Sequence, residues 1–372
     1  MKAIGKHKHE LDTPCLLVDR KKLMQNLQVM QKSVVDAGKN LRPHAKTHKC
    51  SEIAKKQMET GAVGVCTAKL SEAEALADRG VDRILITGPV VLPLKAERLL
   101  SLLERCPSLM LVIDDLENAK LLNGACGERN LRVDVLLDID PGLQRTGVCL
   151  SDACELGSRI MELGNLNLRG IQAYAGQVQH VHSYAERRDK SLACMLGVQE
   201  VFRDLKEAGM TGTVFTGAGT GTFDIDTAVE DLTDLQVGSY ALMDAEYRSI
   251  GSAVDEHNFT LFEPALTMLT SVVSSNQGEF VTVDAGLKTM YRDGATPVVL
   301  SPDDREYSYD WFGDEYGKIS FRGGRKKLKS GCVFELIVSH CDPTVNQFDF
   351  LFITEKERVV DVWPVDLRGK SQ

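Results

Sequence analysis

Residues 133–148 read VDVLLDIDPGLQRTGV, a branched apolar run that stops at the turn Asp140-Pro141-Gly142. An apolar run bounded by a turn is typical of a strand that is buried on both faces of a parallel sheet. Seven similar runs alternate with amphipathic segments, at residues 41–46, 62–67, 83–87, 109–114, 168–174, 213–216 and 235–242. Eight strands alternating with helices over roughly 230 residues predict an α/β fold of the (β/α)8 TIM type. An open doubly wound sheet is the alternative that this alternation leaves open.

The pattern changes after residue 255. Short alternating or apolar runs now follow one another with little helical periodicity, and turn residues such as Asp293-Gly294 separate them. These signals predict a β-rich second domain. We therefore expect a barrel over residues 13–250 and a β-rich domain over residues 255–372, to which residues 1–12 could add a strand.

Composition narrows the class of partner and the compartment. The formal net charge of −9 argues against nucleic acid or an anionic membrane as a partner. No apolar run is long enough to span a bilayer, and the N-terminus lacks the apolar core of a signal peptide. The ten cysteines form no CxxC pair, so we expect free thiols and a cytoplasmic protein.

A basic stretch, PHAKTHK at residues 43–49, ends the first predicted strand. Catalytic groups of a (β/α)8 barrel lie at the C-terminal ends of its strands. Neighbouring cations and burial would lower the pKa of Lys46 there and give an amine that can attack a carbonyl. A solvated basic turn is the alternative interpretation.

A glycine-rich loop, TGAGTGT at residues 216–222, follows the seventh predicted strand. Its GxGxG spacing is not the dinucleotide pattern, but alternating glycines and threonines can form an anion nest. A phosphate held there, opposite an amine on the first strand, suggests pyridoxal 5'-phosphate. A tight turn that needs glycine only for its geometry is the alternative.

A third cluster, SHCDPTVN at residues 339–346, lies in the β-rich part. On an extended segment His340 and Asp342 would point to one face, and Cys341 would point to the other. Imidazole and carboxylate suit a divalent metal such as Mn²⁺ or Mg²⁺, and also Zn²⁺. A His–Asp hydrogen bond at a strand end is the alternative.

Together these motifs resemble a known family. PHAKTHK, SEAE, QRTGV, QAYAGQVQH, TGAGTGT, LQVGSYALMD, DAGLK and SHCDPTVN occur in the order typical of the D-threonine aldolase/D-serine dehydratase-like proteins. These are fold-type III pyridoxal phosphate enzymes with an alanine racemase-like barrel. The resemblance spans nearly the whole chain and implies a homodimer.

The resemblance also implies a role for each matching residue. Lys46 would form the Schiff base with the cofactor, and His180 would be the base that acts on the substrate hydroxyl. Arg145 would contact the cofactor's phenolic oxygen or the substrate carboxylate, and Tyr174 would lie by the pyridine ring. Gln236 takes the place of a racemase arginine that faces the pyridine nitrogen. The remaining roles are phosphate binding by Thr220, Gly221, Gly238 and Ser239, and metal binding by His340 and Asp342.

Two departures from related patterns guide the choice of activity. We find no counterpart of the second-domain tyrosine that alanine racemases use as a base, so a racemase is disfavoured. In D-serine dehydratases the metal pair resembles a histidine and a cysteine with one residue between them. Here Asp342 stands at the position of that cysteine. The prediction is a lyase, an aldolase that cleaves 3-hydroxy-D-amino acids of the D-threonine type to glycine and an aldehyde. A D-serine or D-3-hydroxyaspartate dehydratase is the runner-up, and a non-catalytic pyridoxal phosphate carrier is a third possibility.

Overall fold

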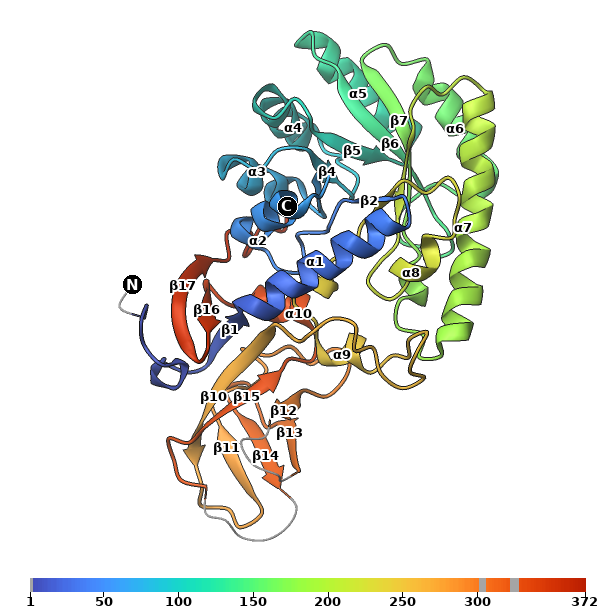
Figure 1. The fold of residues 1–372 in the computed structure, drawn as a ribbon. Helices are drawn as coiled ribbons and strands as arrows, with labels where there is room; N and C mark the ends of the chain where they lie inside the picture. Colours follow the sequence, from blue (N-terminus) through green and yellow to red (C-terminus); the bar gives the residue numbers. More distant parts are fainter. Residues whose placement is uncertain (1–2, 301–305, 322–327) are drawn as a thin grey trace. The chain divides into compact units, whose positions relative to one another are not determined.

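The computed structural model describes residues 3–300, 306–321 and 328–372 (Figure 1). The chain divides into two compact units, each assembled from separate segments. The barrel unit consists of Met30–Lys46, Ser51–Gly238 and Lys370–Gln372, and the mixed-sheet unit consists of Met1–Val29, Thr47–Cys50 and Ser239–Gly369.

The barrel unit is built on eight parallel strands in the order β2-β9-β8-β7-β6-β5-β4-β3. Their bounds are β2 (Asn40–Leu41), β3 (Val65–Thr67), β4 (Ile84–Ile86), β5 (Met110–Ile113), β6 (Val133–Ile139), β7 (Leu166–Ala173), β8 (Val214–Gly217) and β9 (Asp234–Leu235). The two ends of this order meet, because the Ala45 N–H donates to Cys66 O and the Cys66 N–H donates to Pro43 O, both at 2.8 Å. The barrel predicted from the apolar runs is confirmed, and the open sheet is excluded.

Two predicted strands are shorter than expected. The run 41–46 is a strand only at β2, with a single bridge from His44 to Cys66, because Pro43 has no N–H to donate to a ladder. The run 235–242 leaves the sheet after Leu235 and ends in the short helix η3 (Ser239–Ala241). These two segments carry predicted site residues, which therefore lie on irregular backbone.

Helices follow the strands as the periodicity predicted. They are α1 (Arg20–Asp36), which crosses the boundary between the units, α2 (Ser51–Thr60), α3 (Leu70–Asp78), α4 (Pro93–Arg105), α5 (Leu116–Glu128), α6 (Leu150–Met161), α7 (Tyr184–Glu207) and α8 (Phe223–Asp226), with the short η2 (Gly176–Val178) before α7. Local sequence fixes several starts: Asp115 and Ser183 cap α5 and α7 through their side chains, and Pro93 opens α4.

The barrel interior changes from apolar to polar along the strands. Its apolar layer is a buried cluster of Cys66, Leu85, Met110, Val112 and Leu136. Two residues further along their strands stand Thr87, Asp138 and other polar side chains, which share the inward face because side chains in a strand alternate with period two. The barrel therefore carries a polar layer at the C-terminal ends of its strands.

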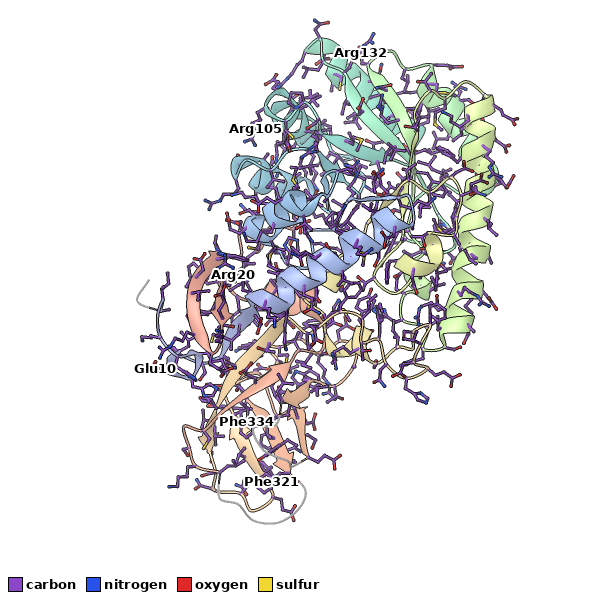
Figure 2. All side chains as sticks on the ribbon, in the orientation of Figure 1. Glu10, Arg20, Arg105, Arg132, Phe321 and Phe334 are labelled. Atoms are coloured by element: carbon purple, nitrogen blue, oxygen red, sulfur yellow. The ribbon has the colours of Figure 1, made fainter. Side chains whose placement is uncertain are left out.

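Among its described residues, the mixed-sheet unit holds nine strands. They are β1 (Cys15–Asp19), β10 (Leu266–Ser274), β11 (Phe280–Val283), β12 (Val298–Leu300), β13 (Tyr307–Trp311), β14 (Gly317–Phe321), β15 (Val333–Ile337), β16 (Phe350–Glu355) and β17 (Arg358–Pro364). Short helices η1 (Lys8–Glu10), α9 (Ala245–Arg248) and α10 (Cys341–Val345) complete it. Tyr307 packs between Phe321 and Phe334, which Figure 2 labels, with ring centroids 6.3 and 5.3 Å away.

The unit boundaries differ from those expected at residues 13 and 250. Strand β1 pairs antiparallel with β10 and parallel with β16, so residues 13–29 join the mixed-sheet unit (Figure 1). The Gly5 N–H also donates to Val359 O, which ties the N-terminal segment to β17. The all-apolar start of β1 fits a strand covered on both faces, and such a run has the same appearance in a barrel.

Across the described ranges, no helix combines the length and apolar character that crossing a membrane requires. All ten cysteines are free thiols, as predicted.

Candidate active site

The predicted site residues fall into two groups. The barrel unit carries Lys46, Arg145, Tyr174, His180, Thr220, Gly221, Gln236 and Gly238, and the mixed-sheet unit carries Ser239, His340 and Asp342.

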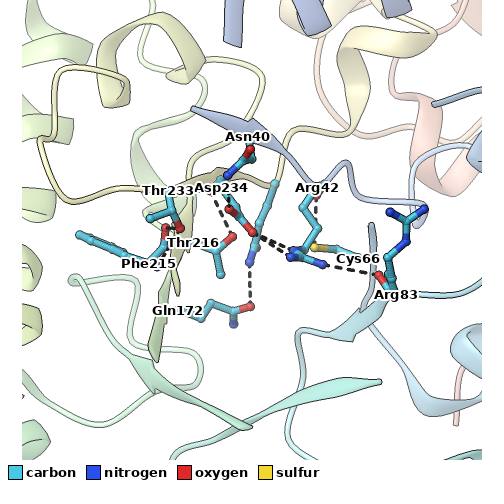
Figure 3. Close-up of polar contacts among 10 residues, drawn as sticks. Asn40, Arg42, Cys66, Arg83, Gln172, Phe215, Thr216, Thr233 and Asp234 are labelled. Carbon is cyan, nitrogen blue, oxygen red and sulfur yellow. Dashed lines mark hydrogen bonds and ion pairs between the residues drawn. The ribbon is translucent and has the colours of Figure 1, made fainter. Parts of the chain in front are cut away.

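Lys46 stands at the end of a segment that is held by hydrogen bonds on both sides. Upstream, the buried Arg42 guanidinium contacts Asp234 Oδ2 through Nε at 3.0 Å and Nη2 at 2.9 Å (Figure 3). His44 Nε2 lies 3.1 Å from Thr87 Oγ1, and the Lys46 N–H donates to His44 Nδ1 at 3.3 Å. The Lys46 side chain is half-buried among buried neighbours. The backbone at Lys46 is therefore fixed by an imidazole that itself contacts Thr87, directly after β4.

These contacts also change the charge expected around Lys46. A backbone N–H can only donate, so His44 Nδ1 is the acceptor in its contact with Lys46. Arg42 is neutralised by Asp234. Within the barrel unit the basic stretch is thus less cationic than its sequence indicates.

Below the rim, the polar layer forms a hydrogen-bonded chain from β6 to the segment after β9. Asp138 accepts from Gln172 Nε2 at 2.9 Å and from Thr146 Oγ1 at 3.0 Å, and Gln236 Nε2 donates to Gln172 Oε1 at 3.0 Å. Burial raises the pKa of Asp138 to about 6, although the hydrogen bonds from Gln172 and Thr146 act in the opposite direction. Gln236, a predicted cofactor contact, is therefore part of a network rather than an isolated amide.

The glycine-rich loop packs tightly against Gln179. A Cβ at Gly219 would lie 2.3 Å from Gln179 Oε1, and one at Gly221 would lie 2.1 Å from Gln179 O. The Gly221 N–H donates to Gln179 Oε1 at 3.1 Å. Close packing thus explains both glycines, and this N–H, a predicted phosphate donor, is already satisfied within the protein. Thr220 is buried at the tip of the loop.

The buried Asp226 carboxylate and the buried Arg187 guanidinium both form hydrogen bonds with the glycine-rich loop. Asp226 accepts from Thr222 Oγ1 and Ser191 Oγ, each at 2.6 Å. Arg187 Nε donates to Gly221 O at 2.7 Å. Sequence reasoning missed these partners, because a carboxylate or an arginine within a helix carries no signal that distinguishes a buried anchor from a solvated charge.

We predict that Asp226→Asn will alter the pH dependence of stability. Burial raises the pKa of Asp226 from 3.8 to about 6, so the native state holds the proton more tightly than the unfolded chain does. Wild-type protein therefore loses unfolding free energy at this site as the pH rises from about 4 to about 6, whereas asparagine does not titrate. Relative to wild type, the variant should gain up to about 3 kcal/mol over this window. Urea unfolding across the range measures this difference.

The matched control for that experiment is Asp189→Asn, an exposed acid that pairs with its neighbour Arg188. Its stability should follow the wild-type curve at every pH. Parallel curves for Asp226→Asn and wild type would contradict the assignment.

Two further rim loops bring Arg145 and Tyr174 together. The exposed Arg145 guanidinium carbon lies 5.7 Å from the centroid of the Tyr174 ring, in a cation–π arrangement. Gly176 leaves room for that ring, since a Cβ there would come within 2.8 Å of it. The half-buried His180 follows Gln179 directly, so the turn that carries His180 is anchored on the glycine-rich loop.

In the mixed-sheet unit, His340 and Asp342 lie at the start of α10 rather than on the extended segment that we expected. His340 is extended and caps the helix, while Asp342 is in its first turn. The helix begins here because the buried Asp244 carboxylate accepts the Cys341 N–H at 3.0 Å. Even so, His340 Nε2 and Asp342 Oδ1 face each other at 3.7 Å, and the buried Cys341 thiol donates to Met243 O.

Two more carboxylates shape this pair. Asp293 Oδ2 lies 3.3 Å from His340 Nδ1. Burial raises the pKa of Asp244 to about 6, with the charge of His340 opposing the shift. Neither Asp244 nor Asp293 was predicted; the Asp293-Gly294 dipeptide indicated only a turn.

The residues present fit the two groups that the sequence implied. For pyridoxal phosphate, the rim offers the Lys46 amine for an aldehyde, the Gln236 amide in the polar layer, and the Arg145–Tyr174 pair. For a divalent metal, His340 Nε2 and Asp342 Oδ1 lie 3.7 Å apart, which is too long for a good hydrogen bond. The distance suits two ligand atoms that bind one ion, each about 2.1 Å from it.

Comparison with known proteins covers both units. Residues 18–245 match the family described as alanine racemase, N-terminal domain, and residues 265–354 match the putative serine dehydratase domain. The 3-hydroxy-D-aspartate aldolase of Paracoccus denitrificans (strain Pd 1222) is 35% identical over 99% of this chain and 95% of its own. The crystal structure of D-threonine aldolase from Filomicrobium marinum superposes with a TM-score of 0.93 at 34% identity, covering 99% of each chain.

A dehydratase relative is more distant. The D-threo-3-hydroxyaspartate dehydratase of Delftia sp. (strain HT23) is 26% identical over 83% of this chain and 79% of its own. The similarity therefore falls from the aldolases to the dehydratase in both identity and coverage.

Proposed function

Because the chain belongs to the alanine racemase N-terminal domain family, in the D-threonine aldolase/D-serine dehydratase-like group, we propose that it cleaves 3-hydroxy-D-amino acids of the D-threonine type to glycine and an aldehyde. One observation carries this choice: the 3-hydroxy-D-aspartate aldolase is 35% identical over 99% of the chain, whereas the dehydratase of Delftia sp. is 26% identical over 83%. The prediction of an aldolase ahead of a dehydratase is confirmed at the level of relatives.

The surroundings of Cys341 also favour the aldolase. A His/Cys metal pair of the dehydratase type would need a thiolate, but burial raises the pKa of the Cys341 thiol well above its usual value. Its sulfur donates to Met243 O instead. Asp342 is the better metal ligand at this position.

Each residue has a defined part in the proposed reaction. Bound pyridoxal phosphate supplies an electron sink for the α-carbon, and a divalent ion, Mn²⁺ or Mg²⁺ by ligand type, supplies Lewis acidity at the 3-hydroxyl. Lys46 would hold the cofactor covalently, Arg145 would orient its phenolic oxygen or the substrate carboxylate, and His340 with Asp342 would hold the ion. His180 would take the proton of the 3-hydroxyl.

In that reaction the bond between C2 and C3 breaks. The carbon that carried the hydroxyl leaves as an aldehyde, and C2 accepts a proton to give glycine. Phosphate binding by Thr220, Gly238 and Ser239 belongs to the same proposal, as do assembly into a homodimer and a place in the cytoplasm.

A product assay separates the rival activities. Purified protein incubated with D-threonine and Mn²⁺ should release glycine and acetaldehyde in equal amounts, and L-threonine should give neither. A keto acid with ammonia would assign the protein to the dehydratases. Conversion of D-threonine to L-allothreonine without cleavage would indicate a racemase, and binding of the cofactor without any product would indicate a carrier.

A further inference from the structure

Three buried side chains of the barrel's polar layer form a directional chain. Asp138 on β6, Gln172 on β7 and Gln236 after β9 are 4%, 3% and 6% exposed. Two hydrogen bonds of 2.9 and 3.0 Å join them in that order.

The donor and acceptor of each of these hydrogen bonds follow from the groups that can only accept. Gln172 Nε2 lies 2.9 Å from the Asp138 carboxylate and 3.2 Å from the backbone oxygen of Thr87. A carbonyl oxygen cannot donate, so the Gln172 nitrogen is assigned on this side whatever the protonation state of Asp138. The Gln172 oxygen must then face Gln236 and accept from it.

The same reasoning fixes the orientation of the Gln236 side-chain amide. Gln236 has to turn its NH₂ group towards Gln172 Oε1, and its own Oε1 is left as the outer end of the chain. Within the described residues, no hydrogen bond to Gln236 Oε1 is present. A ligand that meets Gln236 therefore meets an acceptor, whereas an arginine at this position could only donate.

We propose that Asp138 and Gln172 are positioning residues, which hold Gln236 Oε1 outward so that the site takes the cofactor with its ring nitrogen protonated. This inference rests on the proposed function, in which Gln236 faces that nitrogen. A protonated pyridine withdraws electrons from the α-carbon more strongly than a neutral one, so the network would favour cleavage. The pKa of Asp138, which burial raises to about 6, leaves it ionised at neutral pH and a strong acceptor for Gln172.

The test is the ¹⁵N chemical shift of bound pyridoxal phosphate that is labelled at the ring nitrogen. Wild-type protein should give the shift of a protonated nitrogen. Gln172→Leu removes the amide that orients Gln236 and should move the signal towards that of neutral pyridine. It should also lower kcat roughly 10- to 100-fold, as for other supporting partners, while the cofactor stays bound.

Gln199→Leu is the matched control, because Gln199 is also buried, at 5% exposure, but accepts the Asp231 N–H on the outer helix α7. It should leave the ¹⁵N signal where wild type has it. If Gln172→Leu does not fold, Gln236→Met removes the acceptor directly and should give the same shift.

A neutral ring nitrogen in wild type, or an unchanged signal in the Gln172 and Gln236 variants, would overturn the inference. Failure of the proposed function looks different: the protein then binds no cofactor, or it holds a protonated cofactor and releases no aldehyde from D-threonine.

Discussion

Lys46→Ala should abolish covalent attachment of the cofactor and lower turnover by at least about 10⁴-fold, the upper end of what one catalytic proton-transfer group contributes. The amine is the reacting group, and the backbone that carries it is held because the Lys46 N–H donates to His44 Nδ1. Borohydride reduction followed by peptide mass spectrometry measures the attachment. Wild-type protein should be yellow and should carry the reduced cofactor on Lys46.

Lys49→Ala is the control, since Lys49 belongs to the same basic stretch and its backbone oxygen accepts the Leu367 N–H. Its backbone is already left-handed, with φ of 49°, so the exchange removes the charge without a new conformational demand. Labelling and turnover should persist. Reduced cofactor on another lysine of the Lys46→Ala protein would refute the assignment, and a colourless wild-type protein that binds no cofactor would refute the whole proposal.

Asp342→Ala should lower turnover roughly 10³-fold while the cofactor remains bound. A Lewis-acidic ion contributes several kcal/mol, and each 1.4 kcal/mol is about tenfold in rate. Removing one of two protein ligands should release the ion, because His340 Nε2 alone would remain opposite the lost carboxylate at 3.7 Å. Metal content after dialysis and activity with added Mn²⁺ measure both effects, and a chelator should mimic the variant in wild type.

Asp349→Ala offers the comparison, because this exposed acid of the same unit pairs with Arg368. It should keep both metal and activity. Full activity of wild type in metal-free buffer would exclude the metal from the reaction.

The barrel was predictable from sequence because its strands are buried on both faces and appear as continuous apolar runs. The β6 run 133–139 carries a single partly exposed residue, Asp134. Strand β1 was not among the predicted strands, and its residues were counted only within the barrel expected over residues 13–250. Its partners, Leu269 of β10 and Leu351 of β16, are far away in sequence, and no local pattern records such a pairing.

The site was predictable only as far as its motifs extend. Lys46, His340 and Asp342 stand in recognisable strings, whereas the groups that orient them do not. Gln172 lies 34 residues from Asp138 and 64 from Gln236, so their hydrogen bonds exist only once the barrel has closed. Gln179 and Asp226 were likewise not predicted as partners of the glycine-rich loop, because only folding brings them to it.

The place of β1 between β10 and β16 has a consequence for synthesis. At a translation rate of roughly 5–20 residues per second, β1 leaves the ribosome on the order of 10–50 s before its partners at residues 266–269. Meanwhile its apolar run CLLVD keeps both strand edges unpaired, a state that invites association with other chains. Nascent chains should therefore depend on holding chaperones until β10 and β16 emerge. A fragment that begins after residue 19 would lack β1, the strand that pairs with both β10 and β16.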